Sequence, residues 1–461
     1  MKKQYKIDTQ DTIAAISTPL GEGAIGIIRI SGKEALKIAD AIFKPAKGGT
    51  PSKFRPFTSH YGRVVDGQKS ADETLLTIMR APYSYTREDS VELSCHGGVI
   101  PLRRTLEIVL KNGARIAEPG EFTRRAFLNG RFDLAQAEAV LDIIRAKTDA
   151  SLDVALGQLE GKLSAYVLRA KDELIEISAQ IEASIDFPDE EINIMSGSKL
   201  KERLESVEKK LAELLETADK GIILRDGISC VICGKPNVGK SSLLNALLQK
   251  ERAIVTHIPG TTRDSIEEFT NIGGVPFKLI DTAGIAPTED IIEREGILRS
   301  REHIERSSLV LLVLDAGSRI TDEDRILLDD TGGKRRMIVI NKIDLPRRID
   351  FKPETRESVF EISAKEGSGI EELKAAMAEA VLGGDVAVPE GAVVTNLRQK
   401  EAVRNARESV VRAIKAVEDG LSAELTAIEV RESLDHIGEI VGEVATDDIL
   451  DRIFSRFCIG K

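Results

Sequence analysis

A glycine-containing segment, Gly234-Lys-Pro-Asn-Val-Gly-Lys-Ser241, has the residue types that bind phosphate groups. It lies between two apolar stretches, and we expect a strand at Ser229–Cys233 before it and a helix at Ser242–Leu248 after it. Glycines let the backbone wrap around phosphates with its N–H groups pointing inward, while Lys240 can reach the β and γ phosphates and Ser241 can bind Mg²⁺. The segment is therefore predicted to be a P-loop.

Two later segments supply groups for the magnesium ion and the γ-phosphate. Leu279-Ile-Asp-Thr-Ala-Gly284 ends an apolar stretch at Asp281, which we expect near Mg²⁺, and Gly284 can present its N–H to the γ-phosphate. Between this motif and the P-loop lies Gly260-Thr-Thr-Arg-Asp264, in which we expect Thr262 to close over the magnesium ion. The order of the three segments argues against three ordinary turns.

A fourth segment, Asn341-Lys-Ile-Asp344, follows the predicted strand Met337–Ile340 and selects the base. The carboxylate of Asp344 can accept hydrogen bonds from N1–H and the exocyclic amine of guanine. Adenine lacks this pair of donors and would leave the carboxylate unpaired, at a cost of a few kcal/mol. Ser363-Ala-Lys365 fits a loop that supports the base. Together with the phosphate motifs, this segment predicts GTP rather than ATP.

Hydrolysis also needs a positioned water and compensation for charge at the β–γ bridge. Ile285 follows the Asp-Thr-Ala-Gly motif and cannot orient water. Asn237 lies inside the P-loop, where its side-chain oxygen can hold a monovalent cation against the phosphates. Stabilising the turn is the alternative role for Asn237.

Hydrophobic periodicity divides the 461 residues into four segments. Residues 1–121 are predicted to form an α+β domain, residues 122–226 and 385–461 to be helical, and residues 227–384 to form an α/β domain. Neither helical segment completes a core alone, so we expect one discontinuous helical domain with the α/β domain inserted into it. In the first domain we expect strands at Ile13–Ser17, Ala24–Ile30, Thr74–Met79 and Val91–Ser94, helices at Glu34–Phe43 and Leu102–Lys111, and a loop at Thr50–Thr58.

Composition limits the classes of protein to which the chain can belong. The net charge of −11 argues against general coating of nucleic acid but allows local recognition of RNA. Basic pairs such as Arg103/Arg104 and Arg124/Arg125 are expected on the solvated surface. No apolar run of membrane-spanning length occurs, and no signal peptide is indicated. Four cysteines do not make a disulfide framework, so a cytoplasmic location is expected.

Several segments outside the nucleotide motifs resemble the MnmE (TrmE) family of tRNA-modification GTPases, and the resemblance covers essentially the whole chain. They are Gly21–Gly32, Ser84–Gly98, Glu118–Gly130 and the terminal Phe457-Cys-Ile-Gly-Lys461. The resemblance implies an N-terminal domain with a fold like that of folate-binding aminomethyltransferases, a discontinuous helical domain and an inserted Ras-like G domain. It also implies a homodimer built through the N-terminal domains.

The same resemblance implies a pocket for 5-formyl- or methylene-tetrahydrofolate in the N-terminal domain. Its residues would be Arg29, Glu92, Arg131 and Lys461, with the cations on the glutamate tail of the folate and Glu92 on its pterin ring. Arg131 stands where relatives often have lysine, so the charge is kept but the geometry can differ. A redox role at Cys458 is the alternative to a structural one. Cys95, Cys230 and Cys233 are expected to be packed inside.

In the G domain, the resemblance implies a potassium ion held by Asn237, Thr256, Ile258 and Thr261, and Mg²⁺ held by Ser241 and Thr262. Glu293 is implied as the catalytic, water-orienting carboxylate. The chain departs from the family at His257, where an acidic residue is common, and at Ala286, where an arginine is frequent. The residues expected to bind GTP are Asn237, Val238, Gly239, Lys240, Ser241, Ser242, Thr256, His257, Ile258, Pro259, Gly260, Thr261, Thr262, Asp281, Thr282, Ala283, Gly284, Asn341, Lys342, Asp344, Ser363, Ala364 and Lys365.

The reaction implied by the resemblance is addition of an aminomethyl or carboxymethylaminomethyl group to C5 of the wobble uridine of certain tRNAs. A flavin-dependent partner, MnmG (GidA), would form a heterotetramer with the homodimer, and GTP hydrolysis would drive a conformational change. Two alternatives stay open at this point. One is a ribosome-assembly GTPase of the Era or Der type, and the other is a scaffold driven by dimerisation of G domains.

Overall fold

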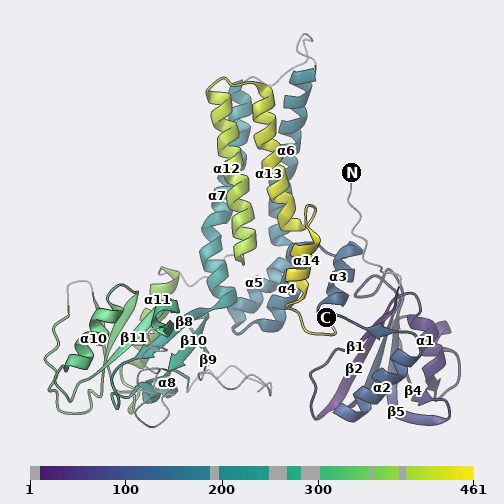
Figure 1. The fold of residues 1–461 in the computed structure, drawn as a ribbon, viewed down its shortest axis with the longest axis horizontal. Coiled ribbons are helices and arrows are strands. Elements are labelled where there is room, and N and C mark those ends of the chain that lie inside the picture. The colour runs from purple at the N-terminus through teal and green to yellow at the C-terminus, as the bar shows by residue number, and fades with distance from the viewer. Residues whose placement is uncertain (1–10, 187–196, 249–266, 282–301, 354–356, 384–390) are drawn as a thin grey trace. The chain divides into compact units, whose positions relative to one another are not determined.

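The computed structural model describes residues 11–186, 197–248, 267–281, 302–353, 357–383 and 391–461. The chain divides into two compact units, one formed by Met1–Leu141 with Leu434–Lys461 and the other by Asp142–Ser433 (Figure 1). These boundaries differ from the four-part division expected from the sequence, which stays a prediction. Among the described helices, none is both long and apolar enough to cross a membrane.

The first unit contains a seven-stranded sheet in the order β3-β4-β5-β6-β2-β1-β7. Neighbouring strands are antiparallel except β1 and β7. The strands are β1 (Ile13–Ile16), β2 (Gly23–Ser31), β3 (Phe43–Pro45), β4 (Ser59–Asp66), β5 (Lys69–Met79), β6 (Ser90–Gly97) and β7 (Arg115–Ile116). All four strands expected in this region are present, and β3, β4 and β7 were not anticipated.

Helices α1 (Ala35–Ile42) and α2 (Val99–Lys111) share one hydrophobic core with the sheet. Side chains alternate along β2, so Ile28 and Ile30 are buried in this core while Arg29 points to the other face. Gly26 allows α2 to approach closely, because a Cβ at that position would lie 2.6 Å from a Leu102 methyl group. The alternation therefore aims the polar residue of β2 away from the core.

The end of the chain also belongs to the first unit. Helix α3 (Glu121–Leu128) contacts the C-terminal helix α14 (Asp447–Phe454). Phe454 packs near Phe127 and Phe457, with ring centroids 6.5 and 5.6 Å apart. This aromatic contact holds the last residues of the chain beside the N-terminal sheet.

The helices of the second unit include α5 (Asp149–Leu159), α6 (Lys162–Asp186), α7 (Gly197–Asp226) and α12 (Leu397–Glu418). Helices α4 (Leu134–Arg145) and α13 (Ala423–Val441) cross the boundaries between the two units. Apolar residues at three- and four-residue spacing on α7 are buried, among them Leu204, Val207 and Leu211. Ion pairs between Glu208 and Arg407 and between Asp219 and Lys400 join α7 to α12. Helices from before and after the α/β region thus pack together.

The α/β region of this unit has a six-stranded sheet in the order β13-β12-β11-β8-β10-β9. All neighbours are parallel except β9 and β10. Its elements are β8 (Ile228–Cys233), α8 (Lys240–Leu248), β9 (Glu267–Ile272), β10 (Val275–Asp281), β11 (Leu309–Asp315), α10 (Asp322–Thr331), β12 (Arg336–Asn341), β13 (Ser358–Ile362) and α11 (Ile370–Leu382).

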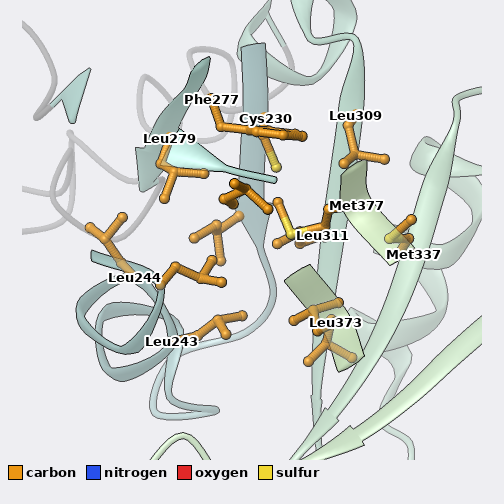
Figure 2. Close-up of a cluster of buried hydrophobic side chains, with 14 of the residues drawn as sticks. Cys230, Leu243, Leu244, Phe277, Leu279, Leu309, Leu311, Met337, Leu373 and Met377 are labelled. Atoms are coloured by element: carbon orange, nitrogen blue, oxygen red, sulfur yellow. The ribbon is translucent and has the colours of Figure 1, made fainter. Parts of the chain in front are cut away.

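Both faces of this sheet are covered, as the expected α/β pattern requires. Leucines of α8 and α11 pack with alternate residues of the strands in one core, which Figure 2 shows around Cys230, Phe277 and Leu311. Residues of α10 pack on a second core that contains Val231 and Leu312. The parallel strands end at a common edge, where the sequence motifs for nucleotide binding follow β8, β10 and β12.

Candidate functional site

The P-loop begins directly after β8 and ends at α8, as the sequence predicted. Gly234 has φ +151° and Gly239 has φ +98°, both conformations that favour glycine. A Cβ on Gly239 would lie 2.3 Å from Nδ2 of Asn341, and a Cβ on Gly234 would lie 2.5 Å from the carbonyl oxygen of Val313. The glycines are therefore required both by the turn and by close contact with neighbouring strands.

Lys240 and Ser241 are the first two residues of α8, directly after the glycine-containing turn. Nζ of Lys240 donates hydrogen bonds to the carbonyl oxygens of Gly234 and Lys235, both at 2.8 Å. Burial lowers the pKa of Lys240. Oγ of Ser241 donates to Oδ2 of Asp281 at 2.9 Å. Two oxygen atoms thus lie side by side, and oxygen atoms are the ligands that Mg²⁺ prefers.

The base-binding segment is fixed to the P-loop by side-chain hydrogen bonds. Nδ2 of Asn341 donates to the carbonyl oxygen of Val238 at 2.9 Å, and its Oδ1 accepts from the N–H of Ala364 at 3.0 Å. Nζ of Lys342 donates to the carbonyl oxygen of Asn237 at 2.6 Å. The sites for phosphate and for base therefore form one connected structure.

Asp344 is exposed beside this framework, and Ser363 orients it. Oγ of Ser363 donates to Oδ1 of Asp344 at 2.7 Å, and this bond lowers the pKa of the carboxyl group. Asp344 is therefore ionised at neutral pH and can accept two hydrogen bonds from a base. Ser242 lies near the start of α8 and Lys365 follows Ser363 and Ala364, and their roles in binding GTP stay predictions.

Asp315, at the end of β11, is a residue of this site that the sequence analysis missed. Its Oδ2 accepts a 2.7 Å hydrogen bond from Nζ of Lys342, and its Oδ1 accepts from the N–H of Gly317 at 2.8 Å. The signal was an acidic residue that ends the uninterrupted apolar strand β11, in the way that Asp281 ends β10.

A second polar cluster lies on the sheet of the first unit and includes the end of the chain. Arg29 on β2 and Glu92 on β6 are partners in the strand register, and Nε of Arg29 lies 2.8 Å from Oε1 of Glu92. The carbonyl oxygen of Gly460 accepts from Oγ of Ser17 at 3.1 Å and from Nη1 of Arg29 at 3.5 Å. Burial of its ammonium group, and then the charge of Arg29, lower the pKa of Lys461.

Tyr85, which the sequence analysis did not single out, connects the cations of this cluster. Cζ of Arg131 lies 4.6 Å from the centroid of the Tyr85 ring and Cζ of Arg29 lies 5.2 Å from it. Oη of Tyr85 is 2.9 Å from Oγ1 of Thr123, and burial raises the pKa of the phenol. The structure thus brings Arg29, Glu92, Arg131 and Lys461 to one region, in which cations outnumber carboxylates and an anionic ligand is favoured.

Comparisons with known proteins give the family. The profile described as "GTP-binding protein TrmE N-terminus" matches residues 12–131, and the "MnmE helical domain" profile matches residues 134–458. The protein named tRNA modification GTPase MnmE from Alkaliphilus metalliredigens is 48% identical over 98% of this chain and 99% of its own length. The protein of the same name from Enterococcus faecalis is 46% identical over 98% of both chains. The chain belongs to the MnmE family.

Membership in the MnmE family confirms the resemblance found in the sequence. The family profiles together extend from residue 12 to residue 458, so the match is not confined to the nucleotide motifs. A structure of Era from Aquifex aeolicus is 24% identical over 40% of this chain and 66% of that chain, with a TM-score of 0.27. The MnmE family is therefore favoured over the Era or Der alternative.

Part of the expected site lies outside the described residues. This part includes the catalytic candidate Glu293 and most of the expected potassium ligands. The residues are Thr256, His257, Ile258, Pro259, Gly260, Thr261, Thr262, Thr282, Ala283, Gly284 and Glu293. Their roles in binding potassium, magnesium and GTP and in orienting water stay predictions.

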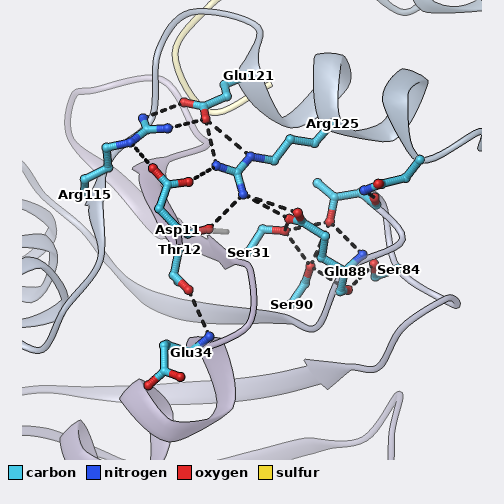
Figure 3. A network of polar contacts seen from close by, with 12 residues as sticks. Asp11, Thr12, Ser31, Glu34, Ser84, Glu88, Ser90, Arg115, Glu121 and Arg125 are labelled. Atoms are coloured by element: carbon cyan, nitrogen blue, oxygen red, sulfur yellow. Dashed lines mark hydrogen bonds and ion pairs between the residues drawn. The ribbon is translucent and has the colours of Figure 1, made fainter. Parts of the chain in front are cut away.

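The expectation that basic pairs lie on the solvated surface holds for Arg103/Arg104 and is wrong for the other pair, since Arg125 is buried and Arg124 is half-buried. Arg125 has a side chain that is only 1% exposed and forms ion pairs with Asp11, Glu88 and Glu121 (Figure 3). Nη2 of Arg125 lies 2.5 Å from Oδ1 of Asp11 and 2.9 Å from Oε1 of Glu121. Arg124 pairs with Asp451 at 2.7 Å. A buried cation needs such partners. They fix α3 next to the residues that are expected to bind folate.

The cysteines behave as the sequence analysis expected. Cys95, Cys230 and Cys233 are buried, and Cys458 is exposed. Burial raises the pKa of Cys95 and of Cys233 to about 12, and it also raises the pKa of Cys230. The three buried thiols are therefore protonated packing groups, and the role of Cys458 stays open.

Proposed function

We propose that this member of the MnmE family hydrolyses GTP and acts in the modification of tRNA. The observation that carries the proposal is the similarity to proteins named tRNA modification GTPase MnmE, at 46 to 48% identity over 98% of the chain. The geometry of the P-loop and of the base-binding segment supports the same conclusion. Each motif expected for GTP that falls within the described residues lies at one edge of the sheet.

In this proposal, each described side chain has a defined task. Lys240 exchanges its two backbone carbonyl partners for oxygens of the β and γ phosphates, which are stronger, charged acceptors. Ser241 and Asp281 would hold Mg²⁺, which offsets the charge that develops on the phosphates. Asp344 accepts from guanine, and its bond to Ser363 fixes the direction of the carboxylate. Asn341 and Lys342 would hold the base-binding segment at a fixed position relative to the P-loop.

The experiment has two parts. Purified protein is assayed for GTP and ATP turnover beside Lys240→Ala, with Lys209→Ala on the exposed face of α7 as the matched surface control. Nucleosides of tRNA are then analysed from a deletion strain that carries each form of the gene. We expect wild type and Lys209→Ala to hydrolyse GTP and restore modified nucleosides, and Lys240→Ala to do neither. Unmodified tRNA in the strain that expresses active wild-type enzyme would refute the role in tRNA.

A finer part of the proposal assigns a reduced folate to the cluster of Arg29, Glu92, Arg131 and Lys461. The glutamate tail of a folate carries two carboxylates, and guanidinium groups bind carboxylates in a planar, bidentate manner. Glu92 can accept from the amine and ring N–H of a pterin while keeping its bond to Arg29. The one-carbon unit would be that of 5-formyl- or methylene-tetrahydrofolate. Calorimetric titration with 5-formyltetrahydrofolate tests this part, and absence of binding would refute it.

The remaining parts of the proposal rest on the family resemblance. They are a homodimer through the N-terminal domains, a heterotetramer with the flavin-dependent MnmG (GidA) protein, and potassium at Asn237. Asn237 has φ +63°, a left-handed conformation that asparagine adopts more readily than most residues. The product would be an aminomethyl or carboxymethylaminomethyl group at C5 of the wobble uridine. Sedimentation of the chain alone and with the flavoprotein tests the assembly.

A further inference from the structure

The second residue of the P-loop, Lys235, forms an ion pair that phosphate binding does not require. Its Nζ lies 2.9 Å from Oδ2 of Asp324 on α10 and 3.4 Å from Oγ of Ser318. The side chains of Lys235 and Asp324 are only 15% and 2% exposed. A pair with so little exposure is screened weakly by solvent, so its geometry is better defined than that of a surface pair.

Asp324 has a second, purely local task at the start of α10. It forms a capping box with Thr321, whose Oγ1 and N–H donate to Oδ2 of Asp324 at 2.8 and 2.9 Å. A capping box needs no burial and no cation. The buried carboxylate of Asp324 therefore needs compensation for its charge beyond the cap, and the ammonium group of Lys235 supplies it.

The charge on Asp324 depends on these contacts. Burial acts to raise the pKa of the carboxyl group, but the hydrogen bonds from Lys235 and Thr321 outweigh it and the pKa lies below its usual value. Oδ1 of Asp324 makes no hydrogen bond within the described part of the chain. Because Oδ1 lacks a partner among the described residues, the buried negative charge is stabilised mainly by the groups that contact Oδ2. Loss of Lys235 would therefore leave this charge without a compensating cation.

The ion pair anchors the side of the P-loop that the base-binding segment does not reach. The carbonyl oxygens of Gly234 and Lys235 accept from Lys240, so the backbone of Lys235 helps to set where the phosphate-binding ammonium lies. On the other side, Asn341 and Lys342 bind the carbonyl oxygens of Val238 and Asn237. The loop is thus held at both ends, by β12 and by α10.

We propose that Asp324 is a positioning residue for nucleotide binding, because through Lys235 it holds the P-loop backbone in the conformation that receives the phosphates. This inference rests on the proposed binding of GTP. A loop that is already ordered loses less conformational entropy when ligand binds, so its affinity is higher. The β-phosphate is common to GDP and GTP, so both nucleotides are affected.

The test compares variants that break the ion pair with one that breaks only the helix cap. Lys235→Met keeps most of the side-chain stem and removes the charge, and Asp324→Asn removes the charge at the other end. Thr321→Ala is the matched control, because it removes the hydroxyl group of the cap and keeps both charged side chains of the ion pair. The dissociation constants of fluorescent GDP and GTP analogues are measured for each purified protein, together with the midpoint of denaturant unfolding.

We expect Lys235→Met and Asp324→Asn each to raise the dissociation constants of both GDP and GTP about tenfold or more, and tenfold corresponds to ~1.4 kcal/mol. The double variant should be no weaker than the worse single variant, since both changes break one interaction. Lys235→Arg should recover part of the affinity. Thr321→Ala should lower the unfolding midpoint and keep both dissociation constants within about twofold of wild type.

Several results would overturn the inference. Wild-type affinity in Lys235→Met, or an equal loss of affinity in Thr321→Ala, would show that the ion pair does not position the P-loop. Should Asp324→Asn fail to fold, the comparison of Lys235→Met with Lys235→Arg decides, and equal affinities of these two would refute the role of charge. Binding of GTP by the wild-type protein is measured before any variant. Failure of the wild-type protein to bind GTP would refute the proposed function itself.

Discussion

Replacing Gly460 by alanine tests whether the end of the chain contributes to the proposed folate site. Gly460 has φ +95°, and a Cβ there would lie 2.5 Å from the carbonyl oxygen of Ile16 and 2.8 Å from Cα of Ser17. Both obstacles are backbone atoms, which cannot rotate away as a side chain can. Alanine therefore cannot occupy this position without moving the tail.

The structure allows a rough estimate of the balance. The left-handed conformation costs an alanine ~1–2 kcal/mol before the steric contact is counted. The carbonyl group of Gly460 is held by Ser17 at 3.1 Å and Arg29 at 3.5 Å, and such bonds contribute about 0.5–1.5 kcal/mol each. The ~1–2 kcal/mol of backbone strain, together with the 2.5 Å contact to Ile16, is comparable to what holds the residue, so alanine should displace Gly460 and Lys461. The buried rings of Phe454 and Phe457 keep the preceding helix in place.

The assay is calorimetric titration with 5-formyltetrahydrofolate, beside GTP turnover. We expect the affinity for folate to fall about tenfold or more, since a charge-assisted contact from Lys461 is worth ~1.5–3 kcal/mol. Deletion of Cys458–Lys461 should give the same loss, and GTP turnover should stay near wild type in both. Gly113→Ala is the matched control, because Gly113 has φ +111° and open space around its Cβ position.

Two outcomes would contradict this reasoning. Wild-type folate affinity in Gly460→Ala would mean that the tail does not reach the ligand. An equal loss in Gly113→Ala would mean that general strain in the first unit, rather than displacement of Lys461, weakens binding.

Three further predictions concern the nucleotide site. Asp344→Asn should lower the affinity for GTP at least ~100-fold and shift the preference toward xanthosine triphosphate, because the amide cannot accept hydrogen bonds from both guanine donors. Competition binding with both nucleotides measures this change, and an unchanged affinity for GTP would refute the assignment. Hydrolysis should be faster in potassium than in sodium at equal ionic strength, owing to Asn237 and the Thr256–Thr261 loop, and equal turnover rates would exclude a potassium site. Glu293→Ala should lower turnover by at least ~10²-fold with nearly unchanged nucleotide affinity, as expected for a positioned acid–base group; turnover close to wild type would leave Glu293 a solvated residue.

Local motifs allowed the nucleotide site to be proposed from the sequence, because their residues are adjacent in sequence and their chemistry dictates the spacing. Pairs between distant residues were not predictable in this way. Lys235 and Asp324 are separated by 89 positions, and only the packing of α10 against the sheet brings them together. Asp315 has a clear local signal, yet its partner Lys342 depends on β11 and β12 being neighbours.

The N-terminal unit shows the same limit more strongly. Arg125 was expected on the surface because adjacent arginines usually lie there. Its partner Asp11 is 114 positions away, so no local pattern indicated the ion pair. Strand β4 was missed since its sequence, Ser-His-Tyr-Gly-Arg-Val-Val-Asp, has little apolar alternation. The gathering of Arg29 and Lys461 followed only from the family resemblance, since no periodicity relates the two ends of a chain.

The junction between α7 and β8 has a mechanical consequence. Helix α7 has 30 residues and is followed by a single residue, Gly227 with φ +78°, before the strand that leads to the P-loop. At 1.5 Å per residue this helix is ~45 Å long, so a tilt of ~5° at its base would move its far end by ~4 Å. Gly227 lies against Pro276 on β10, the strand that ends at Asp281. A small tilt of β8 and β10 at this junction would therefore be amplified along α7.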